Sequence, residues 1–395
     1  MLRLRNHLLP LLRAASLLPS PLHHRGTLLS TSASAAPFSL EDYLVATCGL
    51  APAQARKAYQ KALDGATKAK PSGELCYSRL NSASNPDAVL ALLSGVGLAR
   101  ADIAAVVAAD PLILRSSVKN IGPRLLALRD RFGLSAPQIA RFLLVGSRAL
   151  RGCDVGLHLE FLLSFYGSFE QLLVVMKRNN SILWTDLERV VKPNIALFRQ
   201  CGLSVRDIVQ MCSRCPWLLV FNPERVKEFV VRAEELGVPR SSRMFRHAVV
   251  SVASISKEKV AAKLEFLKRA LGCAETEVAI AVSKMPSILG LSKECHLRRI
   301  QFLINEVGME PQYIVERPVL FSLSLEKRLI PRHCVMKVLQ ANGLLNSNMS
   351  FFSLAKIREE TFKLKFIDCH KDSVTGLADA YAAARAGGVP PKSNL

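Results

Sequence analysis

The feature that most constrains the fold is a glycine that recurs at a nearly constant interval through most of the chain. Each such glycine follows an apolar helical pattern and precedes a polar segment, and successive ones are 34 to 36 residues apart. They are Gly97, Gly133, Gly167, Gly202, Gly237, Gly272, Gly308 and Gly343. A period of this size is typical of helical arrays, in which every repeat packs only on its neighbours. The spacing therefore predicts an all-α helical-repeat solenoid rather than two or three separate globular domains.

A proline that begins a short apolar segment is the second, less regular marker of the repeat. Four repeats carry it, at Pro111, Pro216, Pro286 and Pro318. Proline lacks the N–H that a helix interior needs, so we expect the second helix of the repeat to end there and a short apolar turn to follow. The equivalent positions of three other repeats hold Arg148, Asn180 and Val252. The local geometry of those repeats is therefore less well defined by the sequence.

Residues 256–291 show how one repeat is built. Ser256 is suited to cap a first helix, which Gly272 would end in a left-handed conformation that costs glycine nothing. The apolar residues between them are spaced as one stripe of a helix, at Val260, Leu264, Leu267 and Leu271. A second helix is expected from about Glu275 to Met285, before Pro286. Other repeats have comparable capping residues, at Ser135, Ser168, Ser204, Asn222, Ser292 and Ser324.

The first 37 residues have the composition of an organellar transit peptide. No Asp or Glu precedes Glu41, and the segment contains four arginines and a run rich in serine. The apolar stretch around Leu8 is too short and too interrupted for a secretory signal. We expect residues 1–37 to be cleaved, and the spaced arginines favour the mitochondrial matrix over the chloroplast stroma. Charges interrupt every apolar stretch before the length of a membrane span, so we expect no membrane partner.

The remaining boundaries are coarser. Residues 38–86 are expected to form N-terminal helices and a loop, with the loop from about residue 64. The repeats would occupy residues 87–346, a helical cap residues 347–385, and a disordered tail residues 386–395.

The residues described so far resemble the mitochondrial transcription termination factor (mTERF) family, and its large plant branch in particular. The resemblance lies in the 35-residue helical repeat, the Pro-x-Ile/Leu-Leu segments, the basic balance and the leader. The segments 38–50, 85–114 and 324–332 are similar to the opening and the closing repeat of that branch. The resemblance implies a right-handed solenoid of three-helix units, forming a curved half-ring. It also implies that a basic concave surface binds double-stranded nucleic acid.

Charge indicates the class of partner and suggests which residues contact it. The chain has 53 Lys and Arg against 32 Asp and Glu, a surplus typical of proteins that bind polyanions. Basic residues recur early in the first helices of the later repeats, where they oppose the helix dipole. The candidate nucleic-acid-binding residues are Arg225, Lys227, Lys257, Lys259, Lys263, Lys293, Arg298, Arg299, Lys327, Arg328 and Arg332. An ordinary solvated face, partly paired with neighbouring glutamates, is the alternative for any one of them.

Other motifs suggest no chemistry. Cys212 and Cys215 form a Cys-x-x-Cys, but no second ligand pair has zinc-site spacing, so we interpret them as idle thiols. Trp184 and Trp217 follow second helices, and we expect them to pack in the core. No nucleophile elbow or phosphate loop is present, and we expect no enzyme activity, metal or cofactor.

Together these observations predict an organellar regulator of transcription termination or initiation, or of RNA maturation. Its partners would be double-stranded DNA, structured RNA or both, bound by a monomer. Two alternatives remain open. One is a pentatricopeptide-like protein that binds single-stranded RNA, and the other is a protein-interaction scaffold of an organellar ribonucleoprotein.

Overall fold

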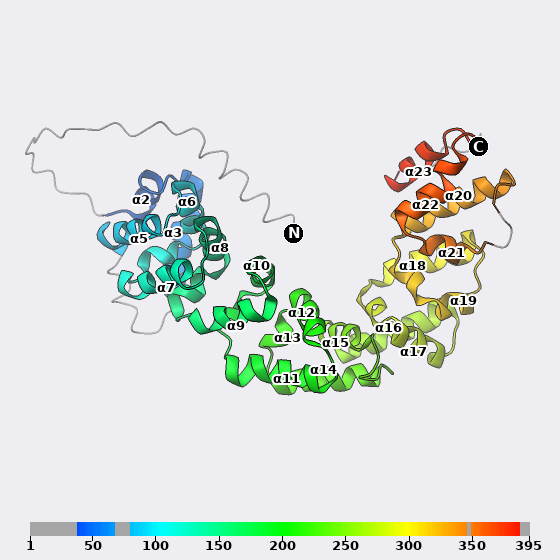
Figure 1. Ribbon diagram of the computed structural model, residues 1–395, viewed down its shortest axis with the longest axis horizontal. Helices are drawn as coiled ribbons and strands as arrows, with labels where there is room; N and C mark the ends of the chain where they lie inside the picture. Colours follow the sequence, from blue (N-terminus) through cyan, green and yellow to red (C-terminus); the bar gives the residue numbers. More distant parts are fainter. Residues whose placement is uncertain (1–37, 68–79, 346–348, 388–395) are drawn as a thin grey trace, which may run out of the picture. The chain divides into compact units, whose positions relative to one another are not determined.

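The computed structural model describes residues 38–67, 80–345 and 349–387 (Figure 1). All the regular elements of these residues are helices and none is a strand, so the all-α prediction is confirmed. The expected leader and most of the expected tail lie outside the described residues. The half-ring that the resemblance implies stays a prediction.

The chain divides into two compact units. The N-terminal unit consists of the residues up to Lys192 together with Cys212–Val220, and the C-terminal unit consists of Pro193–Met211 and the residues from Phe221 onward.

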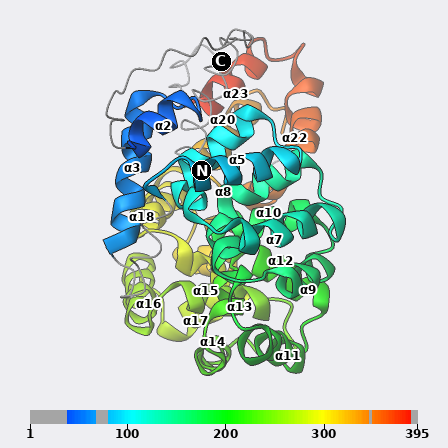
Figure 2. The same cartoon turned by 90° about the vertical axis from the view of Figure 1, so that its left-hand side faces the viewer.

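The N-terminal unit begins with two helices that precede the repeats. Helices α2 (Leu40–Ala46) and α3 (Pro52–Thr67) lie side by side in both views (Figures 1 and 2). Helix α3 extends to Thr67 and α5 begins at Ser84, so parts of the loop expected at residues 64–86 are helical, and the rest of that loop lies largely outside the described residues. The repeat helices follow as α5 (Ser84–Gly95), α6 (Arg100–Ala109), η4 (Pro111–Arg115), α7 (Val118–Asp130), α8 (Ala136–Gly152), α9 (Gly156–Tyr166), α10 (Phe169–Arg178), η5 (Asn180–Leu183), η6 (Leu187–Val191) and α13 (Trp217–Val220).

The C-terminal unit holds the later repeats and the cap, and one continuous apolar core runs from Val260 to Tyr381. Helix α12 (Val205–Arg214) begins in this unit. The other repeat helices are α11 (Lys192–Gln200), α14 (Pro223–Glu235), α15 (Phe245–Ser254), α16 (Lys257–Leu271), α17 (Glu275–Lys284), η7 (Pro286–Gly290), α18 (Lys293–Gln301), η8 (Phe302–Glu306), α19 (Pro311–Glu316), η9 (Pro318–Ser322), η10 (Leu325–Leu329), α20 (Ile330–Ala341) and α21 (Phe351–Lys356). Helix α21 falls within the cap expected at residues 347–385, but it follows Gly343 in the place of a second helix and is therefore grouped with the repeats. The other helices of the cap are α22 (Glu359–Phe366), η11 (Asp368–His370) and α23 (Leu377–Arg385).

The glycine period corresponds to the turn between the first and second helices of each repeat. All eight predicted glycines have a positive φ, between 62° and 91°. Gly272 shows the reason, because it caps α16 at φ 62° and its N–H donates to the carbonyl of Lys268. A side chain in that conformation meets its own backbone, which only glycine avoids. The repeat register predicted from the glycines is therefore confirmed.

The proline marker decides whether a repeat has a separate third helix. Where proline is present, the second helix ends and a short helix follows, as at Pro286 after α17. Where Arg148 and Val252 replace it, the second helices α8 and α15 continue through the position. At Asn180 a short helix forms without proline, because the side chain of Asn179 caps it by accepting from the N–H of Ser181.

Side-chain caps fix the helix starts where the sequence placed them. Ser256 accepts from the N–H of Lys259, Ser292 from that of Cys295 and Ser324 from that of Lys327. Ser135 and Gln138 form the predicted capping box at α8.

Replacing Gly272 with alanine tests the role of the turn glycine. A Cβ there would touch nothing within 4 Å, so the cost is the left-handed backbone alone. We expect Gly272→Ala to lower the free energy of unfolding by about 1–2 kcal/mol in urea denaturation. The matched control is Gly290→Ala, which is equally unobstructed and lacks a positive φ. Equal unfolding midpoints for the two variants would contradict the assigned role.

Candidate nucleic-acid interface

The eleven basic residues predicted to bind nucleic acid separate into two groups in the structure. Seven are exposed on first helices: Arg225, Lys227, Lys257, Lys259, Lys293, Arg298 and Lys327. Arg298 lies in the last turn of α18, and the other six lie nearer the starts of their helices. The other four are buried or half-buried: Lys263, Arg299, Arg328 and Arg332. All eleven belong to the C-terminal unit.

Three of these four residues, Lys263, Arg299 and Arg332, belong to a contact that recurs in every repeat and that we call the brace. A polar side chain of the first helix donates to a backbone carbonyl at the end of the same repeat, just before the next first helix begins. The donors are Asn85, Arg124, His158, Asn194, Arg232, Lys263, Arg299 and Arg332. The Nε2 of His158 lies 2.9 Å from the carbonyl oxygen of Thr185, to which the ring donates when Nε2 carries the proton.

Two braces of the C-terminal unit show the geometry. The Nζ of Lys263 lies 2.6 Å from the carbonyl oxygen of Leu291 and also donates to that of Leu289. The Nε of Arg299 lies 2.9 Å from the carbonyl oxygen of Leu323. Leu291 and Leu323 directly precede the caps Ser292 and Ser324 of the next first helices.

The brace has a clear physical reason. The last carbonyls of a helix have no intrahelical partner, and the negative end of the helix dipole lies there. A lysine, arginine or amide N–H placed there donates to these carbonyls and offsets the negative potential. A hydrogen bond from a charged donor contributes about 1.5–3 kcal/mol to the free energy of unfolding. Burial lowers the pKa of Lys263, and the neighbouring Lys259 and Lys293 lower it further. Lys263 and Arg299 therefore hold the fold together, in addition to any contact with a ligand.

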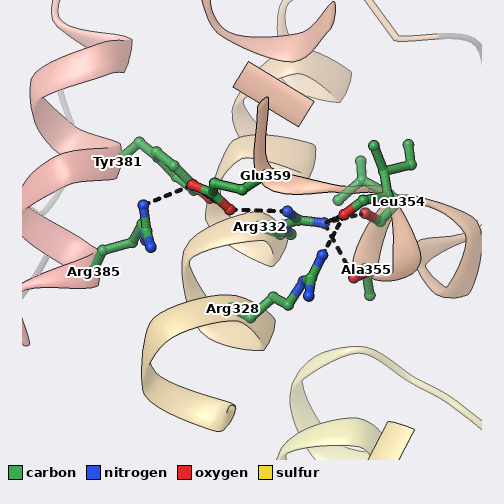
Figure 3. Close-up of polar contacts among 8 residues, drawn as sticks. Arg328, Arg332, Leu354, Ala355, Glu359, Tyr381 and Arg385 are labelled. Carbon is green, nitrogen blue, oxygen red and sulfur yellow. Dashed lines mark hydrogen bonds and ion pairs between the residues drawn. The ribbon is translucent and has the colours of Figure 1, made fainter. Parts of the chain in front are cut away.

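Arg332 is a correction to the sequence prediction. Its side chain is 0% exposed, so it has no access to an external phosphate. Figure 3 shows its guanidinium donating to the carbonyls of Leu354 and Ala355 and to the carboxylate of Glu359, at 2.9, 3.1 and 3.0 Å. Arg328, beside it, is half-buried and donates to the carbonyl of Ile357.

The seven exposed residues form what we call the basic edge. Three have carboxylate partners, since Lys227 pairs with Glu224, Lys257 with Glu235 and Arg298 with Glu326. These pairs are open to solvent, where an ion pair contributes about 0–1 kcal/mol and a competing phosphate can replace it. Arg225 lies over the ring of Phe221, at 4.4 Å from its centroid.

Lys259, Lys293 and Lys327 make no ion pair with any residue that the structure describes. Lys293 lies over the ring of Phe266 at 5.7 Å. Lys259 and Lys293 are close enough to Lys263 to lower its pKa, so the starts of α16 and α18 lie together. The basic edge therefore continues from one repeat to the next.

The helix starts themselves are already partly neutralised. Hydrogen bonds from its own backbone N–H and from Ser256 lower the pKa of Glu258, and the same two kinds of contact, with Ser292, lower that of Glu294. Each glutamate thus takes up one free N–H of the first turn, and the serine cap takes up another. An anion at the basic edge would therefore be held mainly by the lysine and arginine side chains.

Trp184 and the Cys-x-x-Cys pair lie in different environments. Trp184 is 38% exposed and lies near the guanidinium of Arg148, so its predicted core position is wrong. It follows the short helix η5, whose Ile182 and Leu183 fill the core instead. Cys212 and Cys215 are buried as free thiols, and burial raises the pKa of both. Within the described ranges, no group of three His, Cys, Asp or Glu could hold a metal ion.

No single helix of the described residues is long and apolar enough to cross a membrane. Helices α9 and α10 meet the length and composition test only as a pair, and they are bent by 110° at the break between them.

The fold and the basic edge define an all-α helical-repeat protein with an exposed cationic surface on successive first helices. Comparison with known proteins identifies the family: the mTERF family model matches residues 80–363. The chain belongs to the mTERF family. Transcription termination factor MTERF8, chloroplastic, from Arabidopsis thaliana is 21% identical over 204 residues, which are 51% of this chain and 40% of that protein. The match thus spans about two fifths of the length of that relative.

Neighbouring arginines on α18 allow a direct test of the two groups. Arg299→Ala leaves the carbonyl of Leu323 without its donor, and we expect the free energy of unfolding to fall by about 1–3 kcal/mol. Arg298→Ala removes only an exposed ion pair, so we expect a decrease below about 1 kcal/mol. Urea denaturation of both variants measures the difference. Equal decreases would mean that the brace is not a stabilising contact.

Proposed function

We propose that this protein binds double-stranded nucleic acid, DNA or structured RNA, as a monomer through the basic edge. Through that binding it regulates organellar transcription or RNA maturation. The observation that carries the proposal is the basic edge itself, where seven cations remain at the surface although their neighbours in sequence are used in the brace. Membership of the mTERF family and the name of the Arabidopsis relative support the regulatory role.

Backbone phosphates are the ligand groups that fit this edge. Lysine and arginine side chains hold phosphates by charge, and such contacts set affinity without reading sequence. Phe221 and Phe266, the rings near the edge, are already covered by Arg225 and Lys293. This arrangement favours duplex binding over the stacking of single-stranded bases that a pentatricopeptide-like protein would need.

The protein-interaction scaffold is distinguished by its charge pattern. A surface that binds another protein would place its cations against acidic partners without order from repeat to repeat. Here exposed cations lie near the starts of α14, α16, α18 and η10, and only Arg298 of the seven lies further along its helix. A recurring interaction with an evenly spaced polyanion accounts for that order.

Replacing the edge should weaken binding without unfolding the protein. We expect the quadruple variant Lys259→Gln, Lys293→Gln, Arg298→Gln and Lys327→Gln to bind duplex DNA and structured RNA more weakly, to a similar extent across sequences. The slope of log K against log salt concentration should become shallower by about 0.9 for each phosphate that the variant no longer neutralises. Fluorescence anisotropy across a salt series measures both quantities.

A matched control carries the same change of charge away from the edge. Arg269, Lys363, Lys365 and Lys371 are exposed residues of α16, α22 and the turn after η11. Their glutamine variant should keep the wild-type slope. If the edge variant and the control are weakened to the same degree, net charge alone explains binding and the proposed surface is wrong.

The organelle is a separate proposal. The spaced arginines of residues 1–37 favour the mitochondrion, whereas the name of the Arabidopsis relative favours the chloroplast. We expect a fluorescent protein that carries residues 1–40 to enter one of these organelles in plant protoplasts. Fluorescence that stays in the cytosol or follows the secretory route would contradict the proposed leader.

A further inference from the structure

A surface pocket lies where the last repeat meets the C-terminal cap. It forms between the end of η9, the start of η10, the start of α22 and the end of α23. Its polar lining consists of Ser322, Ser324, Lys327, Arg328, Arg358, Glu359, Glu360 and Arg385. Four of these side chains are cationic and two are anionic, so the pocket is positively charged.

The inner wall of the pocket holds more positive than negative charge. The Glu359 carboxylate accepts from Arg332 at 3.0 Å, from Arg385 at 2.7 Å and from the hydroxyl of Tyr381 at 3.1 and 3.2 Å (Figure 3). Burial acts to raise the pKa of Glu359, but the hydrogen bonds from Arg332 and Tyr381 outweigh it and leave that pKa lowered. This carboxylate is therefore ionised and has its partners in place.

Arg328 is the guanidinium that Glu359 does not reach. It donates to the carbonyl of Ile357, while its Nε is buried without a hydrogen-bond partner among the described residues. Burial lowers the pKa of Arg328, and the nearby Arg332 lowers it further. Three guanidinium groups thus lie in a partly buried cluster with one carboxylate, which pairs with only two of them, an arrangement that an additional anion would stabilise.

The outer wall offers two more cations that are free to bind. Lys327 and Arg358 are exposed, and neither makes an ion pair with a residue that the structure describes. The only other carboxylate of the lining, that of Glu360, is exposed to water. The hydroxyl of Ser324 accepts from the N–H of Lys327 and adds a short donor at the rim, whereas the hydroxyl of Ser322 donates to the carbonyl of Val319.

We propose that this pocket binds a phosphate group, held by Lys327 and Arg358 in front of the Arg328, Arg332 and Arg385 cluster. A phosphate oxygen accepts several charge-assisted hydrogen bonds at once, which suits a convergent set of ammonium and guanidinium donors. If the phosphate belongs to the backbone of a bound nucleic acid, the inference rests on the proposed function. The same chemistry also fits a free phosphate or a phosphomonoester.

The first experiment tests the pocket without nucleic acid. Inorganic phosphate, compared with chloride at equal ionic strength, should raise the thermal midpoint of the full chain by about 2 °C or more. The double variant Lys327→Ala and Arg358→Ala should lose this rise. The control Lys363→Ala and Lys365→Ala removes the same charge from exposed positions on α22 outside the pocket and should keep it.

The second experiment identifies the source of the phosphate. In duplex binding across a salt series, the slope should become shallower in the double variant by about 0.9 for each of the one or two phosphates that the pocket neutralises, and should stay unchanged in the control. A shallower slope assigns the pocket to the nucleic-acid backbone. If the double variant has lost the wild-type thermal response to phosphate but its slope is unchanged, the pocket binds a free phosphate ligand, and the role in backbone binding is overturned.

The two failures are distinguishable. If the wild-type protein binds no nucleic acid, the proposed function fails, and the thermal response to phosphate still decides the pocket. If phosphate raises the midpoints of wild type, double variant and control equally, or of none, the pocket proposal is overturned.

Discussion

The interaction on which the repeats depend is the hydrogen bond from a first-helix side chain to a carbonyl that directly precedes the next first helix. Asn85 makes it in the first repeat and Arg332 in the last, with distances between 2.5 and 3.2 Å across the set. Carbonyls at the end of a second or short third helix have no intrahelical partners, so each repeat would otherwise end in unsatisfied acceptors. The brace therefore ties the first helix of each repeat to the end of that repeat, next to the start of the following one.

This coupling divides the cations of the chain between two tasks. Where the donor is a lysine or arginine, as in Lys263 and Arg299, the charged group donates to backbone carbonyls and is partly buried. Residues near Lys263, such as Lys259 and Lys293, remain outside and repel it. The basic edge is therefore the exposed side of the same helices whose buried side carries the brace donors.

The sequence predicted the architecture well because backbone rules leave strong marks. Glycine adopts the left-handed turn at positions such as Gly272 without strain, and proline cannot continue the second helix at positions such as Pro286. The brace left no comparable mark. Its donor is Asn, Arg, His or Lys, and it lies five residues before the glycine at Arg232 but twelve before it at Asn85. Arg332 was predicted to be a surface cation because its burial cannot be recognised from its charge. Trp184 was misplaced because its neighbours Ile182 and Leu183 take the core positions.

The most direct test of the account is amide hydrogen exchange, measured by mass spectrometry, on the Lys263→Met variant, which keeps the side-chain length and removes the donor. The account predicts faster exchange in η7 and the first turn of α18, where Leu289 and Leu291 lose their partner, with α20 and α22 protected as in wild type. Unchanged protection at η7 and α18 would show that apolar packing alone joins the repeats, and would contradict the account.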